Sequence, residues 1–511
     1  MHLLLHPELV AAELGPAGDD GTRLLQAVEK ACAQGWRVWM YAGCARMMAD
    51  AAPMEKLKVL SKRCHWLAAL AGEGDALLES DPRPALQLAL KRLPGPAHIL
   101  TRAVSGDSSG ADFMSLDDFL DGPVQRSPID FIDLKGEQDA IRAQLESGLH
   151  TVLHHGRYIL GPEISELEER LASWVGTEHC ITVASGTDSL LIALMALGTG
   201  PGDEVITVPY TWISTAEVIA LLNATPVFVD IDPDTYNLDP SLLERAITSR
   251  TKAMIPVGLY GQCAEMERIN AIAAARGIPV IEDAAQSFGA ARHGVKSCAL
   301  SRIGSTSFFP SKPLGCYGDG GALFTADDGL AERMRQIRVH GQAEKHLHPL
   351  VGLNGRFDTL QAAVLLAKLE GFEDAVVARG RIGERYTRLF RESLGEDGPV
   401  KTPVIAPGNT SVYAQYTIQI DEPGRVQAQL WEKGIPSVSY YVVPLHLQPV
   451  FDGLGLRKGA FPVAEAVSQR CLSLPMSPGL TESDQERVVD AVCEAAIERS
   501  PVGSARQVRS V

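Results

Sequence analysis

Lys312 stands in a segment whose composition favours a reactive amine. It follows the apolar run Thr306-Ser-Phe-Phe, and the prolines and glycines around it exclude a helix. A surface lysine normally has polar neighbours, whereas Lys312 is preceded by Phe308-Phe-Pro. An amine with few solvated neighbours loses its proton more easily and can form a Schiff base with an aldehyde. We therefore interpret Lys312 as a candidate nucleophile.

Asp283 offers a carboxylate at the end of another apolar run, Val280-Ile-Glu-Asp. Open α/β sheets bind ligands at the carboxyl ends of their strands, so Asp283 could pair with a pyridinium nitrogen. Gln286, three residues later, could donate to a ring hydroxyl. Taken alone, Asp283 is explained equally well as the cap of a following helix.

The segment Ala184-Ser-Gly-Thr-Asp-Ser joins a strand to a helix that we expect to start at Thr187-Asp-Ser. Free N–H groups at the helix start, with the hydroxyls of Ser185 and Thr187, suit a phosphate. Taken alone, an ordinary capped helix explains this segment better. The stronger indication is the order of all three segments, because together they supply the phosphate, ring and aldehyde contacts of pyridoxal phosphate.

The elements that must hold these segments are strands buried on both faces. Short apolar runs without polar alternation lie between helical stretches, which is typical of a parallel sheet covered by helices. Seven runs begin at Cys180, Glu204, Pro226, Ala253, Ile278, Thr306 and Gly321. Later, long helices and two strands, Tyr416–Ile420 and Ser437–Tyr440, indicate a smaller domain. The predicted fold class is α/β, with a mostly parallel seven-stranded sheet and a C-terminal α+β domain.

The segment Asp121-Gly-Pro-Val-Gln-Arg-Ser-Pro interrupts the pattern and marks a domain boundary. We predict an extra α/β module at 1–122, a large domain with an N-terminal arm at 129–375, a small domain at 376–497 and a flexible tail at 498–511. The first module faintly resembles a PIN domain. His6 stands where a PIN nuclease needs a metal-binding aspartate, so we interpret the module as degenerate and non-catalytic.

Composition narrows the class of partner. The 511 residues include 47 basic and 63 acidic ones, a net charge of −16, which argues against nucleic acid or an anionic membrane. No run reaches the ~18 apolar residues of a membrane span, and the N-terminus does not look like a signal peptide. The nine cysteines never show C-x-x-C spacing, which indicates reduced thiols and no metal site. We expect a cytoplasmic protein.

The chain closely resembles the DegT/StrS family of pyridoxal-phosphate-dependent nucleotide-sugar aminotransferases from about Ile129 to about Ala495. The resemblance rests on motifs such as Gly156-Arg-Tyr-Ile-Leu-Gly-Pro-Glu, Glu282-Asp-Ala-Ala-Gln-Ser-Phe-Gly-Ala and Ser411-Val-Tyr-Ala-Gln-Tyr. It implies an aspartate-aminotransferase-like fold, fold type I, and a homodimer with active sites shared between subunits. Lysine at position 312 favours transamination, because the sugar dehydratases of the family carry histidine there.

The resemblance implies a role for each site residue. Lys312 would form the Schiff base with the cofactor and move protons, and Asp283 would pair with the pyridine nitrogen. Trp212, which its context alone would assign to the core, would stack on the cofactor ring. The phosphate would be bound by Gly186, Thr187, Ser307 and, from the partner subunit, Asn354. The sugar and its carboxylate would be contacted by Arg356, Tyr440 and Tyr441.

The implied reaction transfers an amino group from glutamate to UDP-2-acetamido-2-deoxy-3-oxo-D-glucuronate, in the synthesis of surface polysaccharide such as O-antigen. Close relatives read His-Tyr-Pro where this chain has Tyr440-Tyr-Val, so a histidine and a proline of the substrate loop are replaced. One alternative is another nucleotide keto-sugar, with a 4-keto group or a dTDP carrier. Another is a bifunctional protein with an N-terminal nuclease or RNA-binding module.

Overall fold

The computed structural model describes residues 129–497 together with five strands of the N-terminal region. The chain divides into two compact units, residues 1–128 and residues 129–511. The finer domain boundaries expected at residues 122, 375 and 497 stay a prediction.

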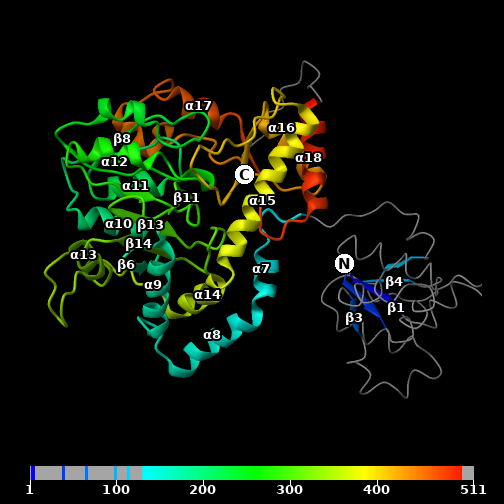
Figure 1. The fold of residues 1–511 in the computed structure, drawn as a ribbon, viewed down its shortest axis with the longest axis horizontal. Coiled ribbons are helices and arrows are strands. Elements are labelled where there is room, and N and C mark those ends of the chain that lie inside the picture. Colours follow the sequence, from blue (N-terminus) through cyan, green and yellow to red (C-terminus); the bar gives the residue numbers. More distant parts are fainter. Residues whose placement is uncertain are drawn as a thin grey trace, which may run out of the picture. The chain divides into compact units, whose positions relative to one another are not determined.

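Seven strands form the central sheet of the second unit, in the spatial order β8-β7-β9-β10-β13-β14-β6. Figure 1 labels β8, β13, β14 and β6 among them. The seven strands are β6 (His179–Val183), β7 (Glu204–Thr207), β8 (Thr225–Phe228), β9 (Thr251–Met254), β10 (Ile281–Asp283), β13 (Ile303–Ser307) and β14 (Gly321–Thr325). Parallel bridges Met254–Val280 and Val257–Asp283 join β9 to β10. Neighbours run parallel except at β14, which is antiparallel to both β13 and β6. The expected mostly parallel seven-stranded sheet is confirmed.

The sheet is apolar on both faces because successive residues of a strand point to opposite sides. In β14, Ala322 and Phe324 join one apolar cluster with residues of α9 and α14, whereas Leu323 joins another with α10 and α13. The helices of this part are α7 (Leu134–Ala140), α8 (Arg142–His155), α9 (Pro162–Val175), α10 (Gly186–Ala196), α11 (Ser214–Leu221), α12 (Met266–Ala274), α13 (Asp328–Arg338) and α14 (Thr359–Leu369). None of the helices that the structure describes is long and apolar enough to cross a membrane.

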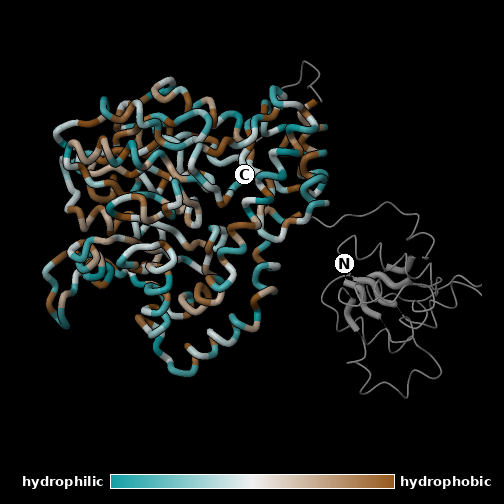
Figure 2. The backbone as a smooth tube through the Cα atoms, in the orientation of Figure 1, coloured by the Kyte–Doolittle hydropathy of each residue, from teal (hydrophilic) through white to brown (hydrophobic). Residues whose placement is uncertain are grey.

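The C-terminal part packs helices on a two-stranded antiparallel sheet, β15 (Tyr416–Gln419) and β16 (Cys471–Leu474). The helices are α15 (Phe372–Leu394), α16 (Pro423–Glu432) and α18 (Glu482–Ile497), whereas α17 (Pro462–Ser468) packs in the apolar cluster that holds β7, β9 and α12. In α15 the residues Ile382, Tyr386 and Phe390, spaced by one helical turn, are buried in a third cluster. Figure 2 shows the matching alternation of hydrophobic and hydrophilic residues along these helices.

The strand expected at Ser437–Tyr440 is wrong. This segment forms only one bridge, in which the backbones of Val438 and Ser473 exchange hydrogen bonds of 3.1 and 2.8 Å. The continuous partner of β15 is β16, which the sequence analysis missed. The chain leaves the bridge after Val438, and Tyr440 and Tyr441 line a cavity instead.

The N-terminal strands form a parallel sheet in the order β3-β2-β1-β4-β5. They are β1 (His2–Leu5), β2 (Arg37–Met40), β3 (Cys64–Trp66), β4 (Ala97–Leu100) and β5 (Asp112–Met114). His6, on which the degenerate PIN interpretation depends, lies outside the described residues. That interpretation, and the nuclease or RNA-binding alternative, therefore stay predictions.

Candidate active site

The loop that follows β13 presents Lys312 to a cavity. The loop turns tightly, because the N–H of Lys312 donates to the carbonyl of Phe309 at 2.8 Å. Phe308 is fully buried and anchors the start of the loop. Gly315 is required for the close return of the chain, since a Cβ there would lie 2.4 Å from the carbonyl oxygen of Pro310. Within residues 129–497, the Lys312 amine makes no hydrogen bond or ion pair, so it is available to a ligand.

Asp283 lies at the end of β10 with its side chain buried. Its Oδ2 accepts a hydrogen bond from the Thr215 hydroxyl at 2.9 Å, and its Oδ1 accepts one from the N–H of Ala285 at 3.1 Å. Burial raises the pKa of Asp283, and these hydrogen bonds and the charge of Lys312 oppose that rise. Burial lowers the pKa of Lys312, which the Asp283 carboxylate opposes. The cavity thus holds a carboxylate beside an amine that gives up its proton more readily than a surface lysine.

The first turn of α10 lies where the sequence predicts a phosphate cradle. Its cap is Ser185, whose hydroxyl accepts from the N–H of Asp188 at 3.0 Å, so the helix starts at Gly186 and not at Thr187. The Thr187 hydroxyl bonds that of Ser214 at 2.8 Å and joins the first turns of α10 and α11. A Cβ on Gly186 would lie 2.6 Å from the Cβ of Ser307. The N–H groups of Gly186 and Thr187, which make no hydrogen bond within residues 129–497, therefore lie beside hydroxyl groups where an anion would fit.

Aromatic side chains form another part of the wall. The Tyr441 hydroxyl accepts from Nε2 of Gln286 at 3.1 Å, and the Tyr441 ring lies 6.1 Å from the Trp212 ring. The Tyr440 carbonyl accepts a hydrogen bond from the hydroxyl of the fully buried Tyr210 at 2.8 Å, and this bond fixes the backbone that carries Tyr440 and Tyr441. Trp212 is 58% exposed, so its ring is available for stacking and does not lie in the core, where its context alone would place it.

These side chains line one cavity of about 410 Å³. Of the residues expected from the sequence, the cavity brings together Gly186, Thr187, Trp212, Asp283, Gln286, Ser307, Lys312, Tyr440 and Tyr441. Polar lining residues that the sequence analysis missed include Thr211, Ser214, Thr215, Ser311, Asp319 and Gln415. Three of these, at 211, 214 and 215, lie in the segment that carries Trp212, and Gln415 lies in the motif Ser411-Val-Tyr-Ala-Gln-Tyr.

The structure does not bring Asn354 and Arg356 into the cavity of their own chain. Their segment lies beside the end of β6, where the N–H of Ala184 donates to the carbonyl of Gly355 at 2.9 Å. The Asn354 side chain is exposed, and the Arg356 Nε is buried without a hydrogen-bond partner among the described residues.

The cavity residues fit pyridoxal phosphate. The start of α10 suits the phosphate, the buried carboxylate of Asp283 suits the pyridine nitrogen, the ring of Trp212 suits a flat aromatic system, and the amine of Lys312 suits an aldehyde. Among residues 129–497 there is no group of three or more His, Cys, Asp or Glu placed to hold a metal ion.

Known proteins with similar sequences are aminotransferases, the class of enzyme that the cavity residues suit. The sequence model of the DegT/DnrJ/EryC1/StrS aminotransferase family matches residues 139–493. UDP-2-acetamido-2-deoxy-3-oxo-D-glucuronate aminotransferase of Pseudomonas aeruginosa is 55% identical over 352 residues, which are 69% of this chain and 96% of that protein. dTDP-3-amino-3,4,6-trideoxy-alpha-D-glucose transaminase of Streptomyces venezuelae is 39% identical, over 72% of this chain and 96% of that protein.

The fold also has a close match among solved structures. The crystal structure of a DegT DnrJ EryC1 StrS aminotransferase from Brucella abortus superposes with a TM-score of 0.69 at 44% sequence identity. The match covers 72% of this chain and all of that chain. The family match begins at residue 139, so the N-terminal module lies outside it.

Proposed function

Because this chain belongs to the DegT/DnrJ/EryC1/StrS aminotransferase family, and is a pyridoxal-phosphate-dependent transaminase of fold type I, we propose that it aminates a UDP-linked 3-keto sugar. The sugar is UDP-2-acetamido-2-deoxy-3-oxo-D-glucuronate, glutamate is the amino donor, and the 3-amino product serves surface polysaccharide such as O-antigen. The observation that carries the proposal is the 55% identity to the Pseudomonas aeruginosa enzyme named for that sugar, across 96% of its length.

Each cavity residue has a part in this proposal. Pyridoxal phosphate, when bound, supplies an electron sink for the substrate carbon that loses its proton. Lys312 binds the cofactor aldehyde and accepts and returns protons through its Nζ, while the Asp283 carboxylate keeps the pyridine nitrogen protonated. Trp212 stacks on the ring, and Gln286 donates to the ring hydroxyl.

The remaining residues hold the two charged ends of the ligands. The N–H groups of Gly186 and Thr187, with the Ser307 hydroxyl, bind the phosphate at the start of α10. Tyr440 and Tyr441 contact the sugar from the C-terminal part of the chain.

We also propose a homodimer in which Asn354 and Arg356 of the partner subunit complete each cavity. Support comes from an exposed apolar segment, Tyr158 to Leu160, in which Ile159 is 51% exposed. This segment is bonded to the residues that follow Arg356, through the bridge of Ile159 with Asp358. An apolar surface beside two polar residues that do not reach their own cavity is suited to an isologous contact.

The test is to measure kcat/KM of the purified holoenzyme with a panel of keto-sugars. The panel holds the 3-keto uronate, its neutral 3-keto N-acetylglucosamine counterpart, a 4-keto UDP-sugar and a dTDP-linked 3-keto sugar. We expect the uronate to be preferred over every other sugar, by roughly tenfold or more, since a charged carboxylate contact contributes about 1.5–3 kcal/mol. Preference for a 4-keto or dTDP sugar would instead establish the alternative substrate class. Failure with every sugar would overturn the proposal.

A further inference from the structure

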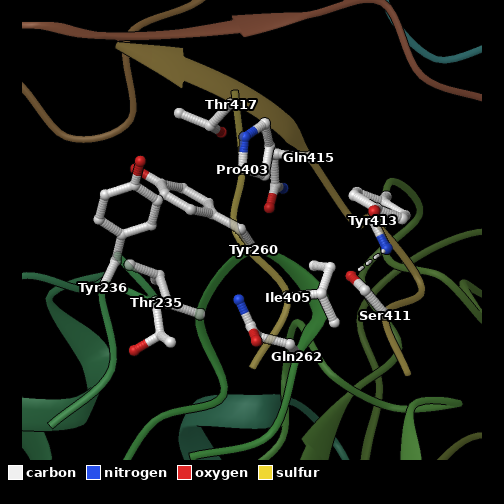
Figure 3. Close-up of a pocket in the computed structure, with 11 residues that line it drawn as sticks. Thr235, Tyr236, Tyr260, Gln262, Pro403, Ile405, Ser411, Tyr413, Gln415 and Thr417 are labelled. Carbon is white, nitrogen blue, oxygen red and sulfur yellow. Dashed lines mark hydrogen bonds between the residues drawn. The ribbon is translucent and has the colours of Figure 1, made fainter. Parts of the chain in front are cut away.

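A small second cavity lies next to the candidate active site, between residues 235–262 and residues 403–417 (Figure 3). Its volume of about 10 Å³ is the room that a single water molecule needs. Gln415 lines both this small cavity and the 410 Å³ cavity that contains Lys312. Figure 3 shows the Gln415 carboxamide directed into the small cavity, near the ring of Tyr260.

The Gln415 carboxamide lacks the hydrogen bonds that a buried amide requires. Its Oε1 is buried and has no hydrogen-bond partner, and its Nε2 makes no hydrogen bond within residues 129–497. Neighbouring side chains of the small cavity are paired. Gln262 donates to the carbonyl of Val404 at 2.8 Å, and Tyr236 accepts from Gln419 at 3.1 Å. A buried amide oxygen without a donor costs about 1–3 kcal/mol, so Gln415 requires a partner that residues 129–497 do not supply.

We propose that Gln415 is a substrate-positioning residue held in place by one buried water. The water occupies the small cavity and donates to Oε1, and this bond orients Nε2 towards the active-site cavity. Nε2 then donates to an oxygen of the substrate. Within one chain, the proposed cofactor contacts come from residues 186–312, whereas Gln415 lines the cavity together with Tyr440 and Tyr441 from the C-terminal part, which we assign to the substrate.

The inference rests on the proposed transamination, whose two substrates both carry carboxylate oxygens. A neutral N–H donor suits either one, the carboxylates of glutamate or those of the uronate sugar. The two halves of the reaction can be followed separately through the absorbance of the cofactor. They therefore show which substrate Gln415 contacts.

The experiment compares Gln415→Met with wild-type holoenzyme. Methionine keeps the length of the side chain and removes both amide groups. We expect kcat/KM to fall roughly fivefold or more in at least one half-reaction, through KM rather than kcat, because one hydrogen bond contributes about 1 kcal/mol. Binding of the 3-hydroxy form of the UDP-uronate, which cannot be aminated, is measured by calorimetry as a second readout. If the sugar is the partner of Gln415, its dissociation constant rises by a similar factor.

Two further variants separate positioning from packing. Gln419→Met is the matched control. Gln419 lies four residues further along the chain, at the end of β15, and donates to the Tyr236 hydroxyl, but it does not line the active-site cavity. We expect wild-type half-reactions from it. Gln415→Glu keeps the length and the acceptor oxygen but loses the N–H donor, so it remains as impaired as Gln415→Met.

The proposal is overturned if Gln415→Met loses less than fivefold in both half-reactions, if Gln419→Met shows the same loss, or if Gln415→Glu restores activity. A failure of the proposed function gives a different result, because the wild-type enzyme itself then does not aminate the sugar. The half-reaction with glutamate, compared between wild type and the Gln415 variants, then decides the role of Gln415.

Discussion

Burial acts in opposite directions on the two charged residues of the cavity. It raises the pKa of Asp283 and lowers that of Lys312, so each side chain alone is driven towards its neutral form. The Thr215 hydroxyl and the N–H of Ala285 donate to Asp283 and favour its ionised form. Lys312 has no such hydrogen bonds among residues 129–497, and only the Asp283 charge favours its protonated form. This asymmetry leaves a fixed carboxylate and a reactive amine.

Replacing Lys312 tests this assignment directly. We expect Lys312→Ala to purify without the absorbance band of a lysine-bound aldehyde, and to lose about 10³-fold or more of its turnover. The control is Lys401→Ala, because Lys401 is a surface lysine paired with Asp234 at 2.6 Å. Wild-type colour and turnover in Lys312→Ala would contradict the assignment.

Glu282 precedes Asp283 in β10 and bonds a different set of groups. It accepts from the Ser297 hydroxyl at 2.8 Å and from the N–H of Cys298 at 2.9 Å. Burial raises the pKa of Glu282 to about 7, although these hydrogen bonds oppose the rise. The folded protein therefore binds this proton more tightly than the unfolded chain. Its contribution to stability is fully present below the ordinary pKa of 4.5 and is lost as pH rises through about 7.

Glu282→Gln stays neutral at every pH and should lack this dependence. Relative to wild type, its free energy of unfolding should rise by roughly 3 kcal/mol between pH 4.5 and pH 8, from the difference between a pKa of about 7 and one of 4.5. Denaturant unfolding at several pH values measures the difference. Parallel pH profiles for the two proteins would refute the prediction.

At the scale of elements, the apolar runs predicted where the strands of the sheet lie in the sequence, but not which strands pair or in which direction. All seven runs contain or overlap a strand, since strands buried on both faces lack polar alternation. The antiparallel direction of β14 depends on its long-range partners β13 and β6, which no local pattern reveals. The same reason explains the wrong strand at Ser437–Tyr440. That segment has a strand-like composition, but its pairing with Ser473 stops after a single bridge.

Candidate site residues were predictable where one segment carries several of them. A glycine, two hydroxyl side chains and the expected start of a helix occur together around Gly186. Lys312 is a charged residue among apolar neighbours. Gln415 and Asp319 gave no such signal, because their chemistry arises only when distant segments meet at one cavity. Ser185 was recognised as a ligand but not as the cap of α10, because helix starts are uncertain by one or two residues.

The start of α10 gives a prediction at this scale. Gly186→Ala should raise the dissociation constant for pyridoxal phosphate roughly tenfold or more, because a Cβ placed 2.6 Å from that of Ser307 must shift the first turn of the helix. Absorbance titration of the cofactor-free protein measures it. Gly200→Ala is the matched control, since its Cβ would meet no atom within 4 Å. Equal dissociation constants for pyridoxal phosphate in both variants would contradict the assignment of the phosphate to the first turn of α10.

On the scale of the whole molecule, the net charge of −16 contrasts with the anionic ligands proposed for the site. Charges farther apart than about 8 Å are largely screened at physiological ionic strength, so the acidic surface does not prevent binding. Capture depends on local groups: the amine of Lys312 and the helix start at Gly186 within one chain, and Arg356 if the partner subunit supplies it. The proposed homodimer would therefore add a positive charge to the cavity that a single subunit does not place there.

Complementation between two inactive variants tests the shared site. Lys312→Ala and Asn354→Ala should each be impaired as homodimers, but their hybrid contains one cavity with neither substitution. After subunit exchange at equal concentrations, turnover should recover to about one quarter of wild type, because half of the dimers are hybrids with one intact site each. The control mixes Lys312→Ala with Asp283→Asn, whose residues line the same cavity of one chain, so no hybrid site is intact. No recovery with Asn354→Ala would show that Asn354 does not complete the partner's cavity. Recovery in the control mixture as well would show that the regained turnover does not come from a shared site.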